Sequence, residues 1–233
     1  MKTIGLIGGM SWESSLEYYR IINEGVKARL GGLHSAECLL WSFDFAEIEA
    51  LQMAGDWDAA TGRMIDAARR VERGGADCIV ICTNTMHKMA GAVQSAVQIP
   101  VLHIADTTAE KICADGLDTI GLLGTGFTME QDFYKGRLTD KYGLKVIVPD
   151  EAGRDIVHRA IYDELCLGIV HDESRQAYLN IMDDLVAQGA QGIILGCTEI
   201  TLLIKPEHTP IRLYDTTRIH AESAVDWALR ESR

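Results

Sequence analysis

Cys197 is the side chain with the clearest capacity for chemistry in this sequence. It lies in Gly196-Cys197-Thr198-Glu199, directly after the apolar run 193–195. We expect a strand to end and a helix to begin there, and a helix N-terminus can lower a cysteine pKa to roughly 3.5–7.5. The resulting thiolate would serve as a nucleophile or a base. The alternative is an inert buried cysteine, and the flanking Thr198 and Glu199 favour a function.

Three blocks of sequence recur in the same order with nearly constant spacing. Residues 3–8 return at 119–124, residues 75–83 at 189–197, and residues 106–108 at 215–217. An internal repeat of this kind indicates two similar units, although βαβ units also resemble one another without a duplication. The second block places Thr83 opposite Cys197, Asn84 opposite Thr198 and Thr85 opposite Glu199.

The distribution of apolar residues predicts an α/β fold. Short runs that are apolar throughout alternate with amphipathic segments, which is typical of parallel strands covered by helices on both faces. We therefore expect two similar domains, each with a parallel sheet flanked by helices, related by a pseudo-two-fold axis. Their predicted bounds are 1–104 plus 214–233 for the first domain and 105–213 for the second.

The carboxyl ends of the strands are where open parallel sheets bind ligands, so we expect a site in the cleft between the domains. Four segments that follow strands and precede helices would line it, namely 8–11, 83–85, 124–128 and 197–199. They are rich in Gly, Ser, Thr and Asn, and they leave backbone N–H groups to hold an anion.

Two helical segments also carry expectations. Ser11 is predicted to cap a helix whose apolar face includes Trp12, Leu16, Tyr19, Ile22 and Val26. The acidic pairs 163–164 and 183–184 are predicted to be solvated helix faces.

Bulk composition excludes several classes of protein. The chain has 233 residues and a formal net charge of −12, which argues against nucleic-acid binding. It contains no apolar run of about 20 residues, so no membrane span is expected. Six scattered cysteines without a secretory signal predict reduced thiols and a cytoplasmic location. The histidines form no HxxxH or HxH pair, so we expect no metal site.

The chain resembles the aspartate/glutamate racemase family, which works without pyridoxal phosphate or another cofactor. Within that family it is similar to the broad-specificity amino-acid racemases. The resemblance lies in residues 4–11, 83–85, 102–106, 124–128 and 196–199, which together span nearly the whole chain. It implies two α/β domains, an acidic amino acid as substrate, a homodimer, and proton exchange at Cα by two cysteines on opposite faces.

The sequence departs from this family at the first cysteine, which is Thr83. Neighbouring strand residues point to opposite faces, so Cys82 should not replace it. An aliphatic hydroxyl is a poor base without an activating partner, and His87, four residues later, is one candidate activator. The resemblance therefore implies that Cys197 exchanges the α-proton of an L-substrate and that reaction from the D-side is slow or absent.

A second departure concerns the side chain of the substrate. Aspartate racemases of this family typically hold the distal carboxylate with an Arg and a Lys. The regions that we align with these positions contain Leu51-Gln52 and the segment 164–168, so Gln52 is the candidate for this contact. The choice among aspartate, glutamate and a neutral amino acid stays open.

The remaining candidates are polar residues at the predicted strand ends. They would donate to the α-carboxylate, accept from the α-ammonium or form walls: Met10, Asn84, Thr85, Thr125, Thr128, Thr198 and Glu199. Ordinary helix capping is the alternative for each of them.

Two other functions fit a site with one cysteine. A decarboxylase on the same scaffold needs a single proton donor to quench a carbanion, and an arylmalonate-type diacid would be its substrate. A degenerate racemase that only binds an acidic amino acid would need no proton transfer.

Overall fold

The computed structural model describes residues 1–230, so the last three residues of the first predicted domain lie outside the described residues. The backbone divides into two compact units, residues 1–104 with 220–233 and residues 105–219. Both passages between the units fall inside helices, α5 (Ile104–Ala114) and α11 (Thr216–Leu229). No helix within residues 1–230 has the length and apolar character to cross a bilayer.

Unit 1 is built on a parallel sheet with the strand order β2-β1-β3-β4. Its elements are β1 (Ile4–Gly8), α1 (Trp12–Leu30), β2 (Cys38–Ser42), α2 (Phe45–Ala54), α3 (Trp57–Arg73), β3 (Cys78–Ile81), the 3₁₀ helix η1 (Thr85–Met89), α4 (Ala90–Ala96), β4 (Val101–Leu102) and the second part of α11.

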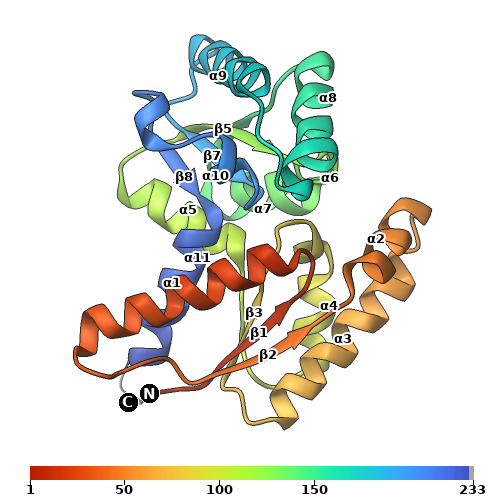
Figure 1. Ribbon diagram of the computed structural model, residues 1–233, viewed down its shortest axis with the longest axis vertical. Helices are drawn as coiled ribbons and strands as arrows, with labels where there is room; N and C mark the ends of the chain where they lie inside the picture. The colour runs from red at the N-terminus through yellow and green to blue at the C-terminus, as the bar shows by residue number, and fades with distance from the viewer. Residues whose placement is uncertain (231–233) are drawn as a thin grey trace. The chain divides into compact units, whose positions relative to one another are not determined.

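Unit 2 repeats this plan with the order β6-β5-β7-β8, again all parallel. Its elements are α5, β5 (Thr119–Gly124), α6 (Gly126–Glu130), α7 (Asp132–Tyr142), β6 (Lys145–Ile147), α8 (Glu151–Arg159), the π-helix η2 (Ala160–Glu164), the 3₁₀ helix η3 (Leu165–Leu167), α9 (Asp172–Ala187), β7 (Ile193–Gly196), α10 (Ile200–Leu203), the 3₁₀ helix η4 (Pro206–His208) and β8 (Leu213–Asp215) (Figure 1).

These two sheets confirm the predicted fold class. Strands β1, β2, β3 and β4 hold the same places in their sheet as β5, β6, β7 and β8 hold in theirs. The sequence repeat therefore corresponds to a repeat of topology, with β3 and β7 ending just before Thr83 and Cys197 respectively.

The sheet of unit 1 is buried on both faces, as its apolar strands predict. Ile7 and Ile81 pack on one side against α3 and α4. Leu6 and Val80 pack on the other side against α1 and α11. Burying one such side chain contributes about 1.5–3 kcal/mol, so both layers of helices hold the strand ends in place.

The apolar face predicted for α1 is partly wrong. Ile22 and Val26 are buried, but Trp12, Leu16 and Tyr19 are 64%, 58% and 49% exposed. The buried sector of this helix is turned away from them because small residues face the sheet. A Cβ on Gly8 would lie 2.3 Å from Ser15 Oγ, so α1 approaches the end of β1 too closely for a larger side chain at position 15.

Candidate active site

The loop after β1 is held by hydrogen bonds within unit 1. Gly9 has a φ of +83°, and its N–H donates to Ser15 Oγ at 2.7 Å. Ser11 caps α1 as predicted, because its Oγ accepts from Ser14 N–H at 3.3 Å. The Met10 side chain is buried in the core against α3 and α4, so any contact of this residue with a ligand would have to come from its backbone.

Cys82 has no solvent-accessible surface. It is fully buried among α1 and α11 residues, and burial raises the pKa of its thiol well above the ordinary value. Thr83 follows it and is half-buried. Asn84 and Thr85 are buried at the start of η1, where Asn84 occupies the N-cap position without a capping hydrogen bond from its side chain.

His87 fixes the backbone of Thr83 and does not contact its hydroxyl in any hydrogen bond that we observe within residues 1–230. His87 Nδ1 lies 2.8 Å from Thr83 O, while Nε2 accepts from Ile104 N–H at 3.2 Å. A neutral ring that donates through Nδ1 and accepts through Nε2 satisfies both contacts. The suggestion that His87 activates the Thr83 hydroxyl is therefore wrong, because both ring nitrogens are used by the backbone.

Three buried histidines pack together next to the loop that carries Thr83. The ring centroid of His87 lies 4.6 Å from that of His103 and 5.6 Å from that of His220. His220 Nδ1 is 2.9 Å from Tyr18 OH, and its Nε2 is 2.8 Å from Leu102 O. Burial lowers the pKa of His220 to about 4, and burial together with its two neighbours lowers the pKa of His87.

Gln52 of α2 is buried in unit 1, with Nε2 donating to Met86 Sδ at 3.1 Å. Met86 belongs to η1, so α2 contacts the same loop that carries Thr83 to Thr85. The structure thus brings Gln52 and the Thr83 loop together, although they lie about 30 residues apart in the sequence.

In unit 2, Thr125 and Thr128 form the turn after β5. Thr125 Oγ1 accepts from Thr128 N–H at 3.4 Å and lies 3.2 Å from Thr128 Oγ1. Thr128 is fully buried beneath Gly124 and Gly196, whose missing Cβ atoms leave room for it. Helix capping therefore accounts for the Thr125 side chain, and the Thr128 hydroxyl pairs with it.

Cys197 and Glu199 form a hydrogen-bonded pair at the end of β7. Cys197 Sγ donates to Glu199 Oε2 at 2.9 Å, and the cysteine is half-buried while Glu199 is 9% exposed. Thr198 Oγ1 lies 2.8 Å from Thr217 Oγ1 at the start of α11. The paired thiol and carboxylate thus lie in a turn that Thr198 links to the start of α11.

The expectation of a lowered pKa for Cys197 is wrong. Burial and the charge and hydrogen bond of Glu199 raise its pKa well above the ordinary value, with a smaller contribution from Cys166. The helix that follows, α10, has only four residues and begins three positions later. A short helix offers little dipole at the sulfur, whereas the carboxylate is in direct contact.

Sequence reasoning missed the surroundings of this pair. Cys166 and Tyr178 interact electrostatically with Cys197, as their effects on the pKa values in this region indicate. The prediction that residues 163 and 164 form a solvated helix face is only partly confirmed. The Glu164 Oε2 atom is buried, whereas Asp163 is exposed as predicted. The alignment of segment 164–168 with a substrate-binding region was the signal that could have identified Glu164.

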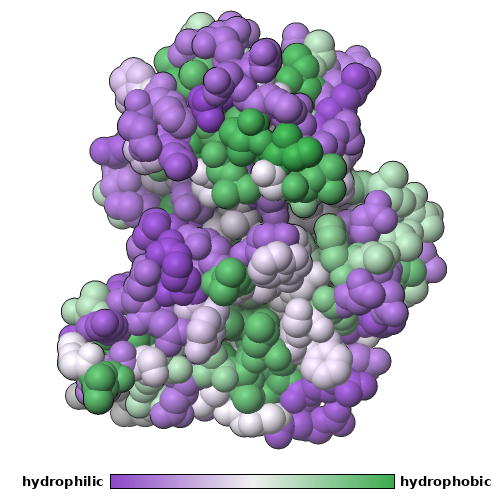
Figure 2. Space-filling model, in the orientation of Figure 1, coloured by the Kyte–Doolittle hydropathy of each residue, from purple (hydrophilic) through white to green (hydrophobic). Residues whose placement is uncertain are grey.

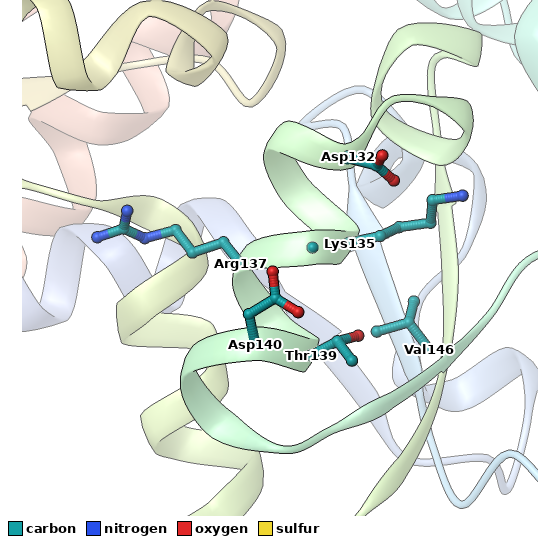
Figure 3. Close-up of a pocket in the computed structure, with 7 residues that line it drawn as sticks. Asp132, Lys135, Arg137, Thr139, Asp140 and Val146 are labelled. Carbon is teal, nitrogen blue, oxygen red and sulfur yellow. The ribbon is translucent and has the colours of Figure 1, made fainter.

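A separate hollow of about 540 Å³ lies on unit 2 between α7 and β6 (Figure 3). Figure 3 shows Arg137 pointing away from Lys135 and Asp132. Its guanidinium forms two hydrogen bonds with Asp106, at 2.6 and 2.7 Å, so this arginine is used within the unit. The hollow contains none of the residues that the sequence predicted for the site.

Residues 1–230 contain no cluster of three or more His, Cys, Asp or Glu side chains suited to a metal ion. The buried histidines fit this finding, because protein groups occupy both ring nitrogens of His87 and of His220.

Comparison with known proteins defines the family. Residues 7–224 match the Asp/Glu/hydantoin racemase family model. The broad specificity amino-acid racemase RacX of Bacillus subtilis (strain 168) is 24% identical over 177 residues, which are 73% of each chain. The chain therefore belongs to the Asp/Glu/hydantoin racemase family.

Two crystal structures are similar over nearly the whole chain. An Asp/Glu racemase candidate from Yersinia pestis is 56% identical with a TM-score of 0.94, covering 99% of this chain and 100% of that one. An aspartate racemase homologue from Pyrococcus horikoshii OT3 is 33% identical with a TM-score of 0.86 and the same coverage. These relatives agree with the family and with the two-unit α/β fold that the apolar pattern and the repeat predicted.

The buried histidines generate a prediction about acid stability. An unfolded His220 binds a proton near pH 6.5, whereas the folded one does so near pH 4, so stability is lost as the pH falls between these values. At about 1.36 kcal/mol per pKa unit the loss from this residue reaches about 3 kcal/mol, and His87 adds to it. The free energy of unfolding, measured with urea at several pH values, should fall accordingly.

The matched variants are His220→Gln and His34→Gln, since His34 is exposed. His220→Gln should reduce the pH slope of the unfolding free energy by up to one proton, while His34→Gln should leave it unchanged. Parallel slopes for wild type and His220→Gln would show that this histidine does not stay neutral in the folded protein.

Proposed function

We propose that the protein is an amino-acid racemase that needs no pyridoxal phosphate and uses Cys197 to exchange the α-proton of an L-amino acid. The observation that carries this proposal is the hydrogen bond from Cys197 Sγ to Glu199 Oε2 at the carboxyl end of β7. Membership of a racemase family supports the reaction type, and the resemblance of the sequence makes aspartate and glutamate the expected substrates.

In this proposal Glu199 prepares the thiol. The raised pKa of Cys197 means that the resting thiol keeps its proton and the carboxylate carries the charge. When the substrate binds, the thiol proton passes to Glu199 Oε2, and the thiolate takes the proton from Cα. The α-ammonium of the substrate would stabilise the negative charge of the nearby thiolate. The free energy needed to remove the thiol proton is therefore lower when the substrate is bound.

The opposite face of Cα is assigned to Thr83, as the repeat predicts. Its hydroxyl does not ionise usefully near neutral pH, and His87 contacts the backbone carbonyl of Thr83. Return of a proton to that face would therefore be slow and would run through the hydroxyl or a water molecule. We also propose that the site lies between the predicted domains, with Asn84, Thr85 and Thr198 as donors to the α-carboxylate.

Deuterium exchange at Cα tests the role of Cys197. In deuterated buffer, L-amino acids should incorporate deuterium while their D-enantiomers react much more slowly, because the thiol serves one face. Cys197→Ala should abolish exchange, and Thr83→Cys should raise the rate with D-substrates, since it supplies a second thiol. Mass spectrometry and chiral chromatography measure the two outcomes.

Three results would count against this assignment. Equal turnover of both enantiomers by the wild type would contradict the one-sided site. Release of carbon dioxide from an arylmalonate would favour the decarboxylase. Binding of L-aspartate that persists in Cys197→Ser, in a parent protein without exchange, would favour an amino-acid-binding protein.

Glu199→Gln should separate two properties of Cys197. Gln can accept the thiol hydrogen bond but cannot take the proton, so exchange should fall by roughly 10²- to 10⁴-fold. Loss of the negative charge should lower the pKa of the thiol, so alkylation by iodoacetamide at pH 8 should become faster. A residue that acts only by supporting the fold would move both rates in the same direction.

We also propose that the exposed stripe Trp12, Leu16 and Tyr19 of α1 contacts a second copy of the chain in the homodimer that the resemblance implies. The three side chains lie at spacings of four and three residues, and each is about half exposed or more. Large apolar side chains gathered on one surface favour a protein interface, and a two-fold axis would pair the stripe with itself.

Leu16→Asp should therefore shift the protein from dimer to monomer, because two carboxylates would meet in an apolar contact. Light scattering coupled to gel filtration measures the mass. Leu33→Asp is the matched control, since Leu33 is fully exposed outside this stripe. An unchanged dimer in Leu16→Asp, or a monomeric wild type, would contradict the proposed interface.

A further inference from the structure

His87 is buried in unit 1, where it joins two segments that are distant in the sequence. The residue is 2% exposed. Its Nδ1 lies 2.8 Å from Thr83 O, and its Nε2 accepts from Ile104 N–H at 3.2 Å. Its backbone N–H also donates to Asn84 O at 3.1 Å. The side chain therefore connects the loop 83–85 to the first residue of α5.

His220 of α11 holds the same segment, residues 102–104. Its Nε2 lies 2.8 Å from Leu102 O, and its Nδ1 lies 2.9 Å from Tyr18 OH. His220 is fully buried, and its ring centroid is 5.6 Å from that of His87. Two neighbouring rings thus bind this segment at the residues before and after His103.

The segment 102–104 lies where the backbone leaves unit 1. Unit 1 is interrupted after Ile104 and resumes at His220. The ring of His87 binds the last residue before the first passage, and its neighbour His220 is the first residue after the second passage. Through these two rings the loop that carries Thr83 is connected to both places where the chain passes between the units.

The partners of the two rings determine where each ring carries its proton. Thr83 O and Leu102 O can only accept, so Nδ1 of His87 and Nε2 of His220 must donate. Ile104 N–H can only donate, so Nε2 of His87 carries no proton. His87 is therefore the Nδ1–H tautomer and His220 is the Nε2–H tautomer. A second proton on His87 would remove the acceptor of the Ile104 N–H group.

The surroundings of the His87 ring favour the neutral form. The titratable groups against it are His103 and His220, at centroid distances of 4.6 and 5.6 Å, and His220 is in turn bound to Tyr18. Within residues 1–230 no carboxylate forms a hydrogen bond or ion pair with His87 or His220. Burial and the two neighbouring imidazoles lower the pKa of His87.

We propose that His87 is a positioning residue of the racemase site: its neutral ring holds the loop 83–85 on the segment 102–104 and thereby fixes the place of the Thr83 hydroxyl, the group assigned to the D-side of the reaction. The hydrogen bond goes to the carbonyl of Thr83, so the ring acts on the position of this residue rather than on the acidity of its hydroxyl. The inference rests on the proposed function and deepens it.

A ratio measured within one sample tests this role. The Thr83→Cys protein is incubated in deuterated buffer with L-aspartate or L-glutamate, whichever the wild type exchanges faster. Initial deuterium uptake into the L-form reports Cys197, and initial formation of the D-form reports the opposite face. Adding His87→Phe removes both hydrogen bonds of the ring. The ratio of D-form to L-exchange should fall roughly tenfold or more, because small displacements of a reacting group are costly.

The ratio is insensitive to a purely structural effect, because both products come from the same folded molecules. Val26→Ala is the matched control, since Val26 is fully buried near the C-terminal end of α1, and it should leave the ratio unchanged. His87→Asn can still donate to Thr83 O, and His87→Gln can still accept from Ile104 N–H. Each should recover part of the ratio that His87→Phe loses, since each restores one of the two bonds.

Nitrogen-15 NMR of the imidazoles tests the geometry without turnover. Near neutral pH, His87 should show a protonated Nδ1 and an unprotonated Nε2, whereas His220 should show the reverse. Loss of one set of signals in His87→Gln assigns them. A protonated Nε2 on His87 would contradict its bond with Ile104 and overturn the positioning role.

The other outcomes separate this inference from the proposed function. An unchanged ratio in His87→Phe, or an equal fall in Val26→Ala, would overturn the role of His87 and leave the exchange by Cys197 intact. No D-form from Thr83→Cys, in protein that still exchanges the L-form, would overturn the assignment of the loop and the role of His87 with it. No exchange with any amino acid would overturn both proposals.

Discussion

The hydrogen bond between the Cys197 thiol and the Glu199 carboxylate is the interaction on which the proposed chemistry of this protein depends. At 2.9 Å it couples two acidic groups in a region from which solvent is largely removed. Two negative charges at that separation would be strongly unfavourable, so one group must hold a proton. The raised pKa of Cys197 places that proton on sulfur. The chemical state of the thiol is therefore a property of the pair.

The corresponding loop of unit 1 is held by neutral groups. His87 connects the carbonyl of Thr83 to the backbone of Ile104, and burial keeps the imidazole uncharged. A neutral ring can donate from one nitrogen and accept at the other, which a lysine or a carboxylate in the same place could not do. The two loops hold equivalent places after β3 and β7, yet unit 1 supplies neutral hydrogen bonds and unit 2 supplies a hydrogen-bonded thiol and carboxylate.

Part of the exposed surface of unit 2 is hydrophobic. Figure 2 shows hydrophobic residues gathered on the drawn face of unit 2, and Leu167, Ile169, Val170 and Leu202 are among the exposed apolar residues of that unit. They belong to η3, the segment that follows it, and α10. The buried Oε2 of Glu164 therefore lies at the start of a segment that carries several exposed apolar side chains.

Local sequence determined the strands, the repeat and the capped helix at Ser11, because periodicity, glycine positions and capping depend on near neighbours in the chain. Family motifs with specific spacing also identify the racemase family from the sequence alone. Tertiary structure decided which face of α1 is buried, since that depends on what packs beside it, and it reversed the expected pKa of Cys197. Burial and the charge of Glu199 together outweigh the dipole of a four-residue helix, and neither can be read from the order of residues alone. The same holds for Glu164, whose exposure is set by elements distant in the sequence.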